Sequence, residues 1–153
     1  MMKKITHVLV GLFLFVGISN VKAQDECTLK YNFFSGDVQS KKYEDAKAHL
    51  LVLLDKCPKL SVSIYQLGDK VAKGLYKKGT DKAGAVALIK KIYEQRLVNF
   101  PSKGAAKATS DYASFLAKEK LASKDEVFSL LEKAYKMDAT KMGVKNIYAY
   151  FQG

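Results

Sequence analysis

The sequence predicts an all-α protein in which antiparallel helical hairpins stack into a short array. Apolar residues recur every three or four positions, which is the helical period, and no segment keeps the alternation of a half-buried strand. Only two prolines occur in 153 residues, and both follow predicted helices. The strongest apolar segments centre near residues 50, 89 and 131, so the pattern repeats about every 40 residues. Each hairpin then buries one face, and stacked neighbours complete the core.

Residues 1–23 have the features of a secretory signal peptide. Lysines at positions 3 and 4 precede an apolar run at 8–18, and Ala23 is a small residue suited to a cleavage site. The run has about 11 residues, whereas a spanning helix needs about 20, so a retained membrane anchor is the less favoured alternative. Cleavage removes three lysines and no acid, which lowers the formal net charge from +11 to +8. We expect an exported, periplasmic or envelope-associated protein with no membrane span after cleavage.

The remaining chain, 24–153, is expected to form one helical-repeat domain. The first helix pair occupies about 27–57 and ends at Pro58, because a residue that precedes proline is pushed out of helical geometry. The second pair occupies about 61–100 and the third about 104–137. The repeat-packing residues of these pairs are predicted to be Ala46, Leu50, Leu53, Pro58, Ile64, Leu67, Gly68, Val71, Ala85, Ile89, Ile92, Leu131 and Ala134.

The C-terminal part of the chain contains one strong start signal and no stop signal. Ser123 is a predicted N-cap, and Glu126 three residues later completes a capping box. A further helix begins within 139–153, and the chain ends inside it at "NIYAYFQG" without a cap. We therefore expect a short or truncated member of its class. A genuine terminus and the remnant of a protease site are the alternatives.

Two segments carry a family resemblance. The segment "IYQLGDKV" resembles the first-helix signature of a tetratricopeptide repeat, with Gly68 as the small residue that lets two helices approach closely. The segment "YEDAKAHLLVLLDKCP" resembles the second-helix signature, with Ala46 at the crossing and Pro58 at the end. Over about residues 25–137 the chain is similar to the exported tetratricopeptide proteins of Bacteroidota. It departs from them in having a repeat nearer 40 residues than 34.

The resemblance implies a partner groove lined by first-helix residues that face away from the second helix. Carried onto this chain, it implies a candidate groove formed by Tyr31, Ser35, Tyr65, Asp69, Lys73 and Asp111. The alternative for the aromatic residues is that Tyr65 and Tyr112 pack between repeats, since aromatic residues at helical spacing usually belong to the core.

The two cysteines are predicted to form a disulfide. Cys27 lies at the start of the first predicted helix, and Cys57 lies at the end of its antiparallel partner, so the two ends meet. At about 1.5 Å per residue, the two helices have similar lengths, and the cysteines should lie level to within one turn. Two cysteines in an exported protein favour a structural disulfide. Two unpaired thiols are the alternative.

The sequence contains no recognisable catalytic or metal-binding motif. After cleavage His49 is the single histidine, and one histidine with two distant cysteines does not make a closed zinc site. His49 falls beside the apolar stripe, where a place at the edge of the core is the simpler interpretation. Nucleophile-elbow, Walker and dinucleotide-binding motifs are absent. We expect a non-catalytic protein with no cofactor and no metal.

Lysine is unusually frequent and predicts a candidate basic face. Lys70, Lys73 and Lys77 follow one another at helical spacing, and the whole candidate face consists of Lys70, Lys73, Lys77, Lys78, Lys90 and Lys91. The alternative is an ordinary solvated face. Nucleic acid is disfavoured by the predicted export and by the lack of a binding motif.

These observations favour a scaffold or adaptor in the bacterial envelope that binds a protein or peptide partner, an acidic one if the lysines take part. The alternative function is electrostatic binding of anionic envelope polymers through the basic face.

Overall fold

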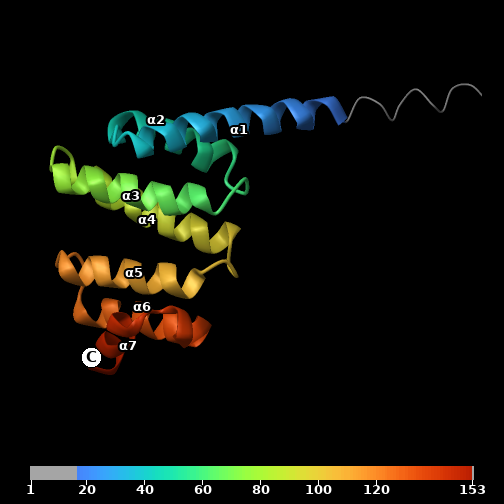
Figure 1. The fold of residues 1–153 in the computed structure, drawn as a ribbon. Coiled ribbons are helices and arrows are strands. Elements are labelled where there is room, and N and C mark those ends of the chain that lie inside the picture. The colour runs from blue at the N-terminus through green and yellow to red at the C-terminus, as the bar shows by residue number, and fades with distance from the viewer. Residues whose placement is uncertain (1–16, 153) are drawn as a thin grey trace, which may run out of the picture.

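The computed structural model describes residues 17–152, and every described secondary-structure element is helical. The first sixteen residues of the predicted signal peptide lie outside the described part, and residues 17–23 belong to the first helix. Figure 1 shows the elements in order: α1 Gly17–Gln39, α2 Tyr43–Lys56, α3 Ser63–Lys78, α4 Lys82–Asn99, α5 Ala105–Lys118, α6 Lys124–Asp138, the 3-10 helix η1 Ala139–Lys141, and α7 Val144–Gln152. The predicted all-α class is confirmed. None of these helices is long and apolar enough to cross a membrane.

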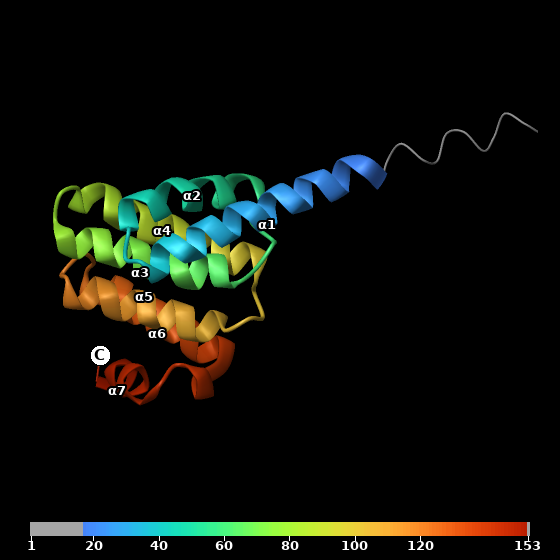
Figure 2. The same ribbon diagram turned by 45° about the horizontal axis from the view of Figure 1, so that its top comes forward.

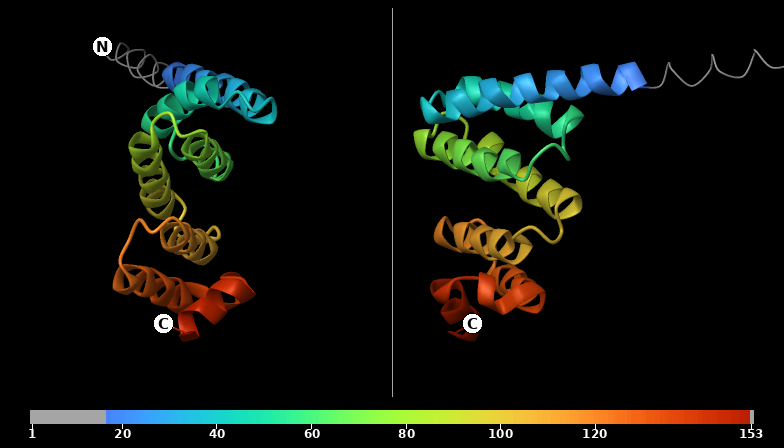
Figure 3. Two further views of the ribbon diagram at one scale, coloured as in Figure 1. Left: turned by 90° about the vertical axis from the view of Figure 1, so that its left-hand side faces the viewer. Right: turned by 45° about the vertical axis from the view of Figure 1, so that its right-hand side comes forward.

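The helices pack as adjacent pairs, α1 with α2, α3 with α4 and α5 with α6, and the pairs stack on one another (Figure 1). The left view of Figure 3 places α3 and α5 on one side of the stack and α4 and α6 on the other. Figure 2 shows α7 at the C-terminal end, against the last pair. This is the predicted array of helical hairpins.

The buried apolar side chains follow the predicted stripes. Leu50, Leu53 and Ile64 have no exposed surface, and Leu131 is about as well buried. Leu67 and Pro58 are half-buried at the margin instead of inside the core. The remaining predicted packing positions are buried: Ala46, Gly68, Val71, Ala85, Ile89, Ile92 and Ala134.

Gly68 lies where three helices meet. A Cβ atom placed on it would lie 3.0 Å from Leu50 Cδ1 of α2 and 3.4 Å from Ile92 Cδ1 of α4. Both neighbours are buried, so neither can swing into solvent. The absence of a side chain at this position lets α3 approach both α2 and α4.

The core of the described residues divides into two clusters. One cluster joins α1 to α4, and the other joins α5, α6 and Met142, which precedes α7. Aromatic pairs connect them: Tyr76 meets Phe115 edge-on at 5.3 Å between ring centroids, and Tyr93 stacks on Tyr112 at 4.4 Å. The junction between α3–α4 and α5 is therefore made by a few large side chains, and this leaves room for a cavity beside them.

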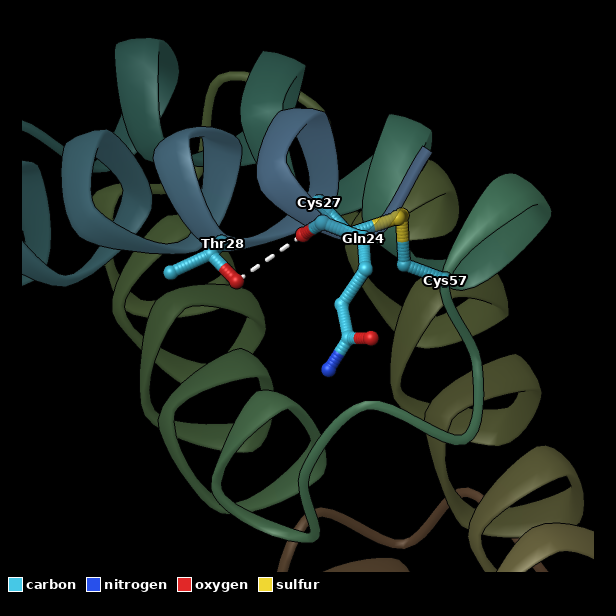
Figure 4. The surroundings of a disulfide bond; sticks show 4 residues. All are labelled: Gln24, Cys27, Thr28 and Cys57. Carbon is cyan, nitrogen blue, oxygen red and sulfur yellow. Dashed lines mark hydrogen bonds between the residues drawn. A yellow bond between two sulfur atoms is a disulfide. The ribbon is translucent and has the colours of Figure 1, made fainter. Parts of the chain in front are cut away.

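The disulfide lies at one end of the first pair (Figure 4). Cys27 of α1 and Cys57, directly after α2, are bonded with their Cα atoms 5.9 Å apart, which confirms the predicted pairing. The structure differs in one respect, because α1 begins at Gly17 and Cys27 lies inside the helix. Thr28 Oγ1, one residue on, donates a hydrogen bond to the carbonyl oxygen of Gln24 at 2.9 Å.

The predicted capping box at the start of α6 is confirmed. The Ser123 hydroxyl oxygen accepts a hydrogen bond from the Glu126 backbone N–H at 3.2 Å, and the Ser123 backbone N–H donates to Glu126 Oε2 at 2.8 Å. The same carboxylate also accepts from the Ser123 hydroxyl at 2.9 Å. These bonds lower the pKa of Glu126 from its usual value of 4.5. The cap satisfies donors that the first turn of a helix otherwise leaves free.

Ser123→Ala is expected to lower the free energy of unfolding by about 0.5 to 2 kcal/mol at neutral pH, because the cap is lost. The pKa of Glu126 is lower in the folded state, so its contribution is present above the unfolded pKa and is lost as pH falls through the folded value. The difference between the variant and the wild type should therefore shrink below about pH 4.5. Urea unfolding at pH 7 and pH 3 measures this. Ser129→Ala, at an exposed position inside α6, is the control and should cost nothing. An equal loss in both variants would contradict the capping role.

Candidate functional site

A cavity of about 200 Å³ lies where α3, α4 and α5 meet. Tyr65, Asp69 and Lys73 of α3 line it, together with Asp111 of α5 and Arg96 of α4. Because residues four apart share a helix face, Tyr65, Asp69 and Lys73 all point to the same side of α3. The stacking of the third pair on the second places α5 beside this face.

Two short ion pairs face the cavity. Lys73 Nζ lies 2.7 Å from Asp69 Oδ2 on α3, and Lys107 Nζ lies 2.7 Å from Asp111 Oδ2 on α5. Lys73 also lies over the Phe115 ring, 5.5 Å from its centroid. Each aspartate is thus neutralised by a lysine one helical turn away, and the two walls present paired charges.

Arg96 is the single arginine among the 26 lysine and arginine residues of the chain. Its Nη2 donates to the carbonyl oxygen of Lys103 at 3.3 Å, and its buried Nε has no hydrogen-bond partner among the described residues. None of the ion pairs of the described part involves Arg96. Burial lowers the pKa of Arg96, and this effect outweighs the opposite influence of Asp69 and Asp111. The guanidinium is therefore a half-buried cation that forms no ion pair within the described residues.

Tyrosines form the apolar part of the cavity. Tyr65 is fully buried, and its hydroxyl donates to the Pro58 carbonyl oxygen at 2.8 Å and accepts from Asn99 Nδ2 at 3.0 Å. Burial raises the pKa of Tyr65, against a lowering effect of the Asn99 bond. Tyr93 and Tyr112 stack between α4 and α5, and the buried Tyr93 hydroxyl has no partner among residues 17–152. Burial is also the main cause that raises the pKa of Tyr112.

The structure brings four of the six candidate groove residues together. Tyr65, Asp69, Lys73 and Asp111 all line the cavity, and Tyr65 is the most buried of them. The ring of Tyr65 meets Phe100, at the end of α4 in its own pair, edge-on at 5.8 Å. Tyr112, by contrast, packs between repeats, because it stacks on Tyr93 of the preceding pair. The other two, Tyr31 and Ser35 on α1, do not line this cavity.

The lysines of the candidate basic face divide between α3 and α4. Lys78 lies 3.6 Å from Glu44 and Lys90 lies 3.9 Å from Glu94, while Lys73 pairs inside the cavity. The exposed members for which the structure records no ion pair are Lys70, Lys77 and Lys91. Half of the face is thus already engaged with carboxylates of the chain.

The sequence pattern did not indicate that Arg96 lies in the cavity. It also missed Lys107 and the stacked pair of Tyr93 with Tyr112. The composition of the chain could have pointed to Arg96, because it is the one arginine in a chain that otherwise uses lysine. Such a position is one where the planar guanidinium has a use that lysine does not serve.

His49 lies half-buried at the edge of the core, with Nε2 3.5 Å from Asp37 Oδ2 and its ring stacked on Phe33. Across the described part of the chain, no group of three or more His, Cys, Asp or Glu side chains is arranged to hold a metal ion. Comparison of the chain with protein-family models, with curated proteins and with solved structures found no match.

Proposed function

We propose that the chain is a non-catalytic, tetratricopeptide-like binding module that acts as a scaffold or adaptor in the bacterial envelope. The observation that carries the proposal is the cavity between α3, α4 and α5, where aromatic side chains, two ion pairs and an arginine outside these ion pairs converge. Aromatic and arginine side chains with a polar margin are the usual composition of an energetic centre in a protein interface.

The size of the cavity favours a polypeptide partner over a small metabolite. Sites for drug-sized ligands have volumes of about 300 to 1,000 Å³, and this cavity has about 200 Å³. A volume of this kind suits one side chain of a larger partner. The partner's backbone would then lie along the exposed face of α3 and α5.

Two further observations support the proposal of an exported protein. The N-terminal residues have the pattern of a signal peptide. The disulfide belongs with an oxidising compartment, where such bonds persist.

The second candidate function is electrostatic binding of an anionic envelope polymer. The observation that favours it is the exposure of Lys70, Lys77 and Lys91, for which no ion pair is recorded within the described part. Contacts of this kind weaken as salt increases.

The two functions are distinguished by capture from native envelope extract with matched variants. Lys107→Glu changes a cavity lysine that is paired at i,i+4, and Lys136→Glu changes a lysine on α6 with nearly the same exposure and the same kind of pairing, to Glu132 at 2.8 Å. We expect a discrete polypeptide to stay bound to the wild type through a wash at about 0.5 M salt. Lys107→Glu should reduce its recovery about tenfold, and Lys136→Glu should leave it unchanged.

Other outcomes decide against the groove. If all captured material is anionic and leaves in the salt wash, the polymer-binding function is supported. If a protein partner stays bound equally to both variants, it binds elsewhere, and the cavity is not its site.

A further inference from the structure

The proposed function leaves open what chemistry the cavity recognises, and the state of Arg96 bears on this question. The guanidinium carries five N–H donors in a planar fork. Within the described part of the chain, one nitrogen bonds to a neutral carbonyl oxygen, at 3.3 Å, and the buried Nε bonds to nothing. A half-buried cation in this state gains from an anion that reaches its remaining donors, because part of its hydration is already lost in the free protein.

The two nearby aspartates do not fill this role. Asp69 and Asp111 are each held at 2.7 Å by the lysine on their own helix, and neither forms an ion pair with Arg96. Counting the charged side chains that line the cavity gives three cations and two carboxylates, a surplus of one positive charge. One added carboxylate would balance the cavity.

The loop between α4 and α5 fixes the position of the guanidinium. Lys103 supplies the carbonyl acceptor, and the next residue, Gly104, has a φ of +68° in the left-handed region. A Cβ atom at Gly104 would lie 3.3 Å from Arg96 Nη2, so a side chain at this position would crowd the guanidinium, and glycine avoids this. An arginine held in this way loses little further side-chain freedom when it binds a ligand.

On the basis of the proposed function, we propose that the cavity recognises an acidic residue of the partner segment, with Arg96 binding the ligand carboxylate. The Tyr93–Tyr112 stack and buried Tyr65 supply the apolar surroundings in which a charge-assisted hydrogen bond is strengthened. Arginine matches a carboxylate through two parallel bonds, which lysine cannot provide. The inferred ligand class is therefore a glutamate or aspartate side chain in an extended polypeptide.

The chain offers a direct probe, because its single arginine gives one Nε–Hε signal in a ¹⁵N-correlated NMR spectrum. The experiment titrates the ¹⁵N-labelled mature protein with a short peptide of alternating alanine and glutamate, at about 0.15 M salt. The matched probe is the same peptide with glutamine in place of glutamate. We expect a saturable shift of the arginine signal with the glutamate peptide and none with the glutamine peptide.

Variants separate the role of the guanidinium from its charge. Arg96→Lys keeps the positive charge and should weaken binding of the glutamate peptide about tenfold. Lys145→Arg adds a guanidinium at an exposed position of α7, outside the cavity and the basic face, and should leave the affinity unchanged. Backbone signals of α5 that stay in place in Arg96→Lys show that the loop at Lys103 is intact.

The outcomes distinguish this inference from the proposed function. If both peptides bind the α3–α5 face equally and the arginine signal does not move, recognition of a carboxylate is wrong and the groove remains. If the glutamate peptide moves only signals of Lys70 and Lys77, the acidic ligand binds the basic face and the inference is overturned. No saturable shift with either peptide would also overturn it, whereas the capture experiment tests the groove independently.

Discussion

Reducing the Cys27–Cys57 disulfide is expected to lower the free energy of unfolding by about 3 to 4 kcal/mol. The bond joins residues 30 positions apart, so it removes a large part of the freedom of the first helix pair in the unfolded chain. A domain of this size has a total stability of about 5 to 15 kcal/mol. Urea unfolding followed by circular dichroism, with and without a reductant, measures the difference.

The control is a chain that lacks both sulfur atoms. The double variant Cys27→Ala and Cys57→Ala should have the lowered stability in both conditions, since a reductant has nothing to act on. Alanine is the chosen replacement because Cys57 is only 7% exposed. A polar side chain such as serine would be buried there without a partner. If reduction lowers the free energy of unfolding of the wild type by less than about 1 kcal/mol, the expectation is wrong. The segment between the two cysteines would then already be ordered in the unfolded chain, so that the bond restricts it little further.

Gly68→Leu is expected to destabilise the protein by about 3 kcal/mol, at the upper end of the range for overpacked cores. The Cβ atom alone would lie 3.0 Å from Leu50 Cδ1, and the rest of a leucine side chain would enter the space between α2 and α4. The gain from replacing glycine inside a helix is only about 1 kcal/mol and does not offset this overlap. The midpoint of urea unfolding reports the loss.

Gly36→Leu is the matched control, because it makes the same change in the interior of α1 at a position where a Cβ atom meets nothing within 4 Å. This variant should be unchanged or slightly stabilised, through helix propensity alone. If Gly68→Leu unfolds at the same urea concentration as Gly36→Leu, α3 does not cross α2 and α4 closely at this residue. Gly68→Ala is expected to lie between the two.

The sequence by itself determined the helices and their pairing. Ala46, Leu50 and Leu53 recur at the helical period, and Ser123 with Glu126 marks the start of a helix. Each of these signals is read within a few residues of the chain. Short connections force consecutive helices to lie antiparallel, which is why the Cys27–Cys57 disulfide could be predicted from their places at the helix ends. All of this depends on local geometry.

The tertiary structure decided the surroundings of the cavity. Arg96 lies near the end of α4, and only the path of residues 100–104 brings Lys103 and Gly104 against its guanidinium. In the same way, the spacing that put Lys73 on a basic face did not reveal that it pairs with Asp69 and lies over Phe115. Tyr31 and Ser35 share a helix role with Tyr65 in the repeat pattern, yet α1 lies outside the cavity. The angle at which one helix pair packs on the next is set by large side chains far apart in the chain, and a periodic pattern does not encode it.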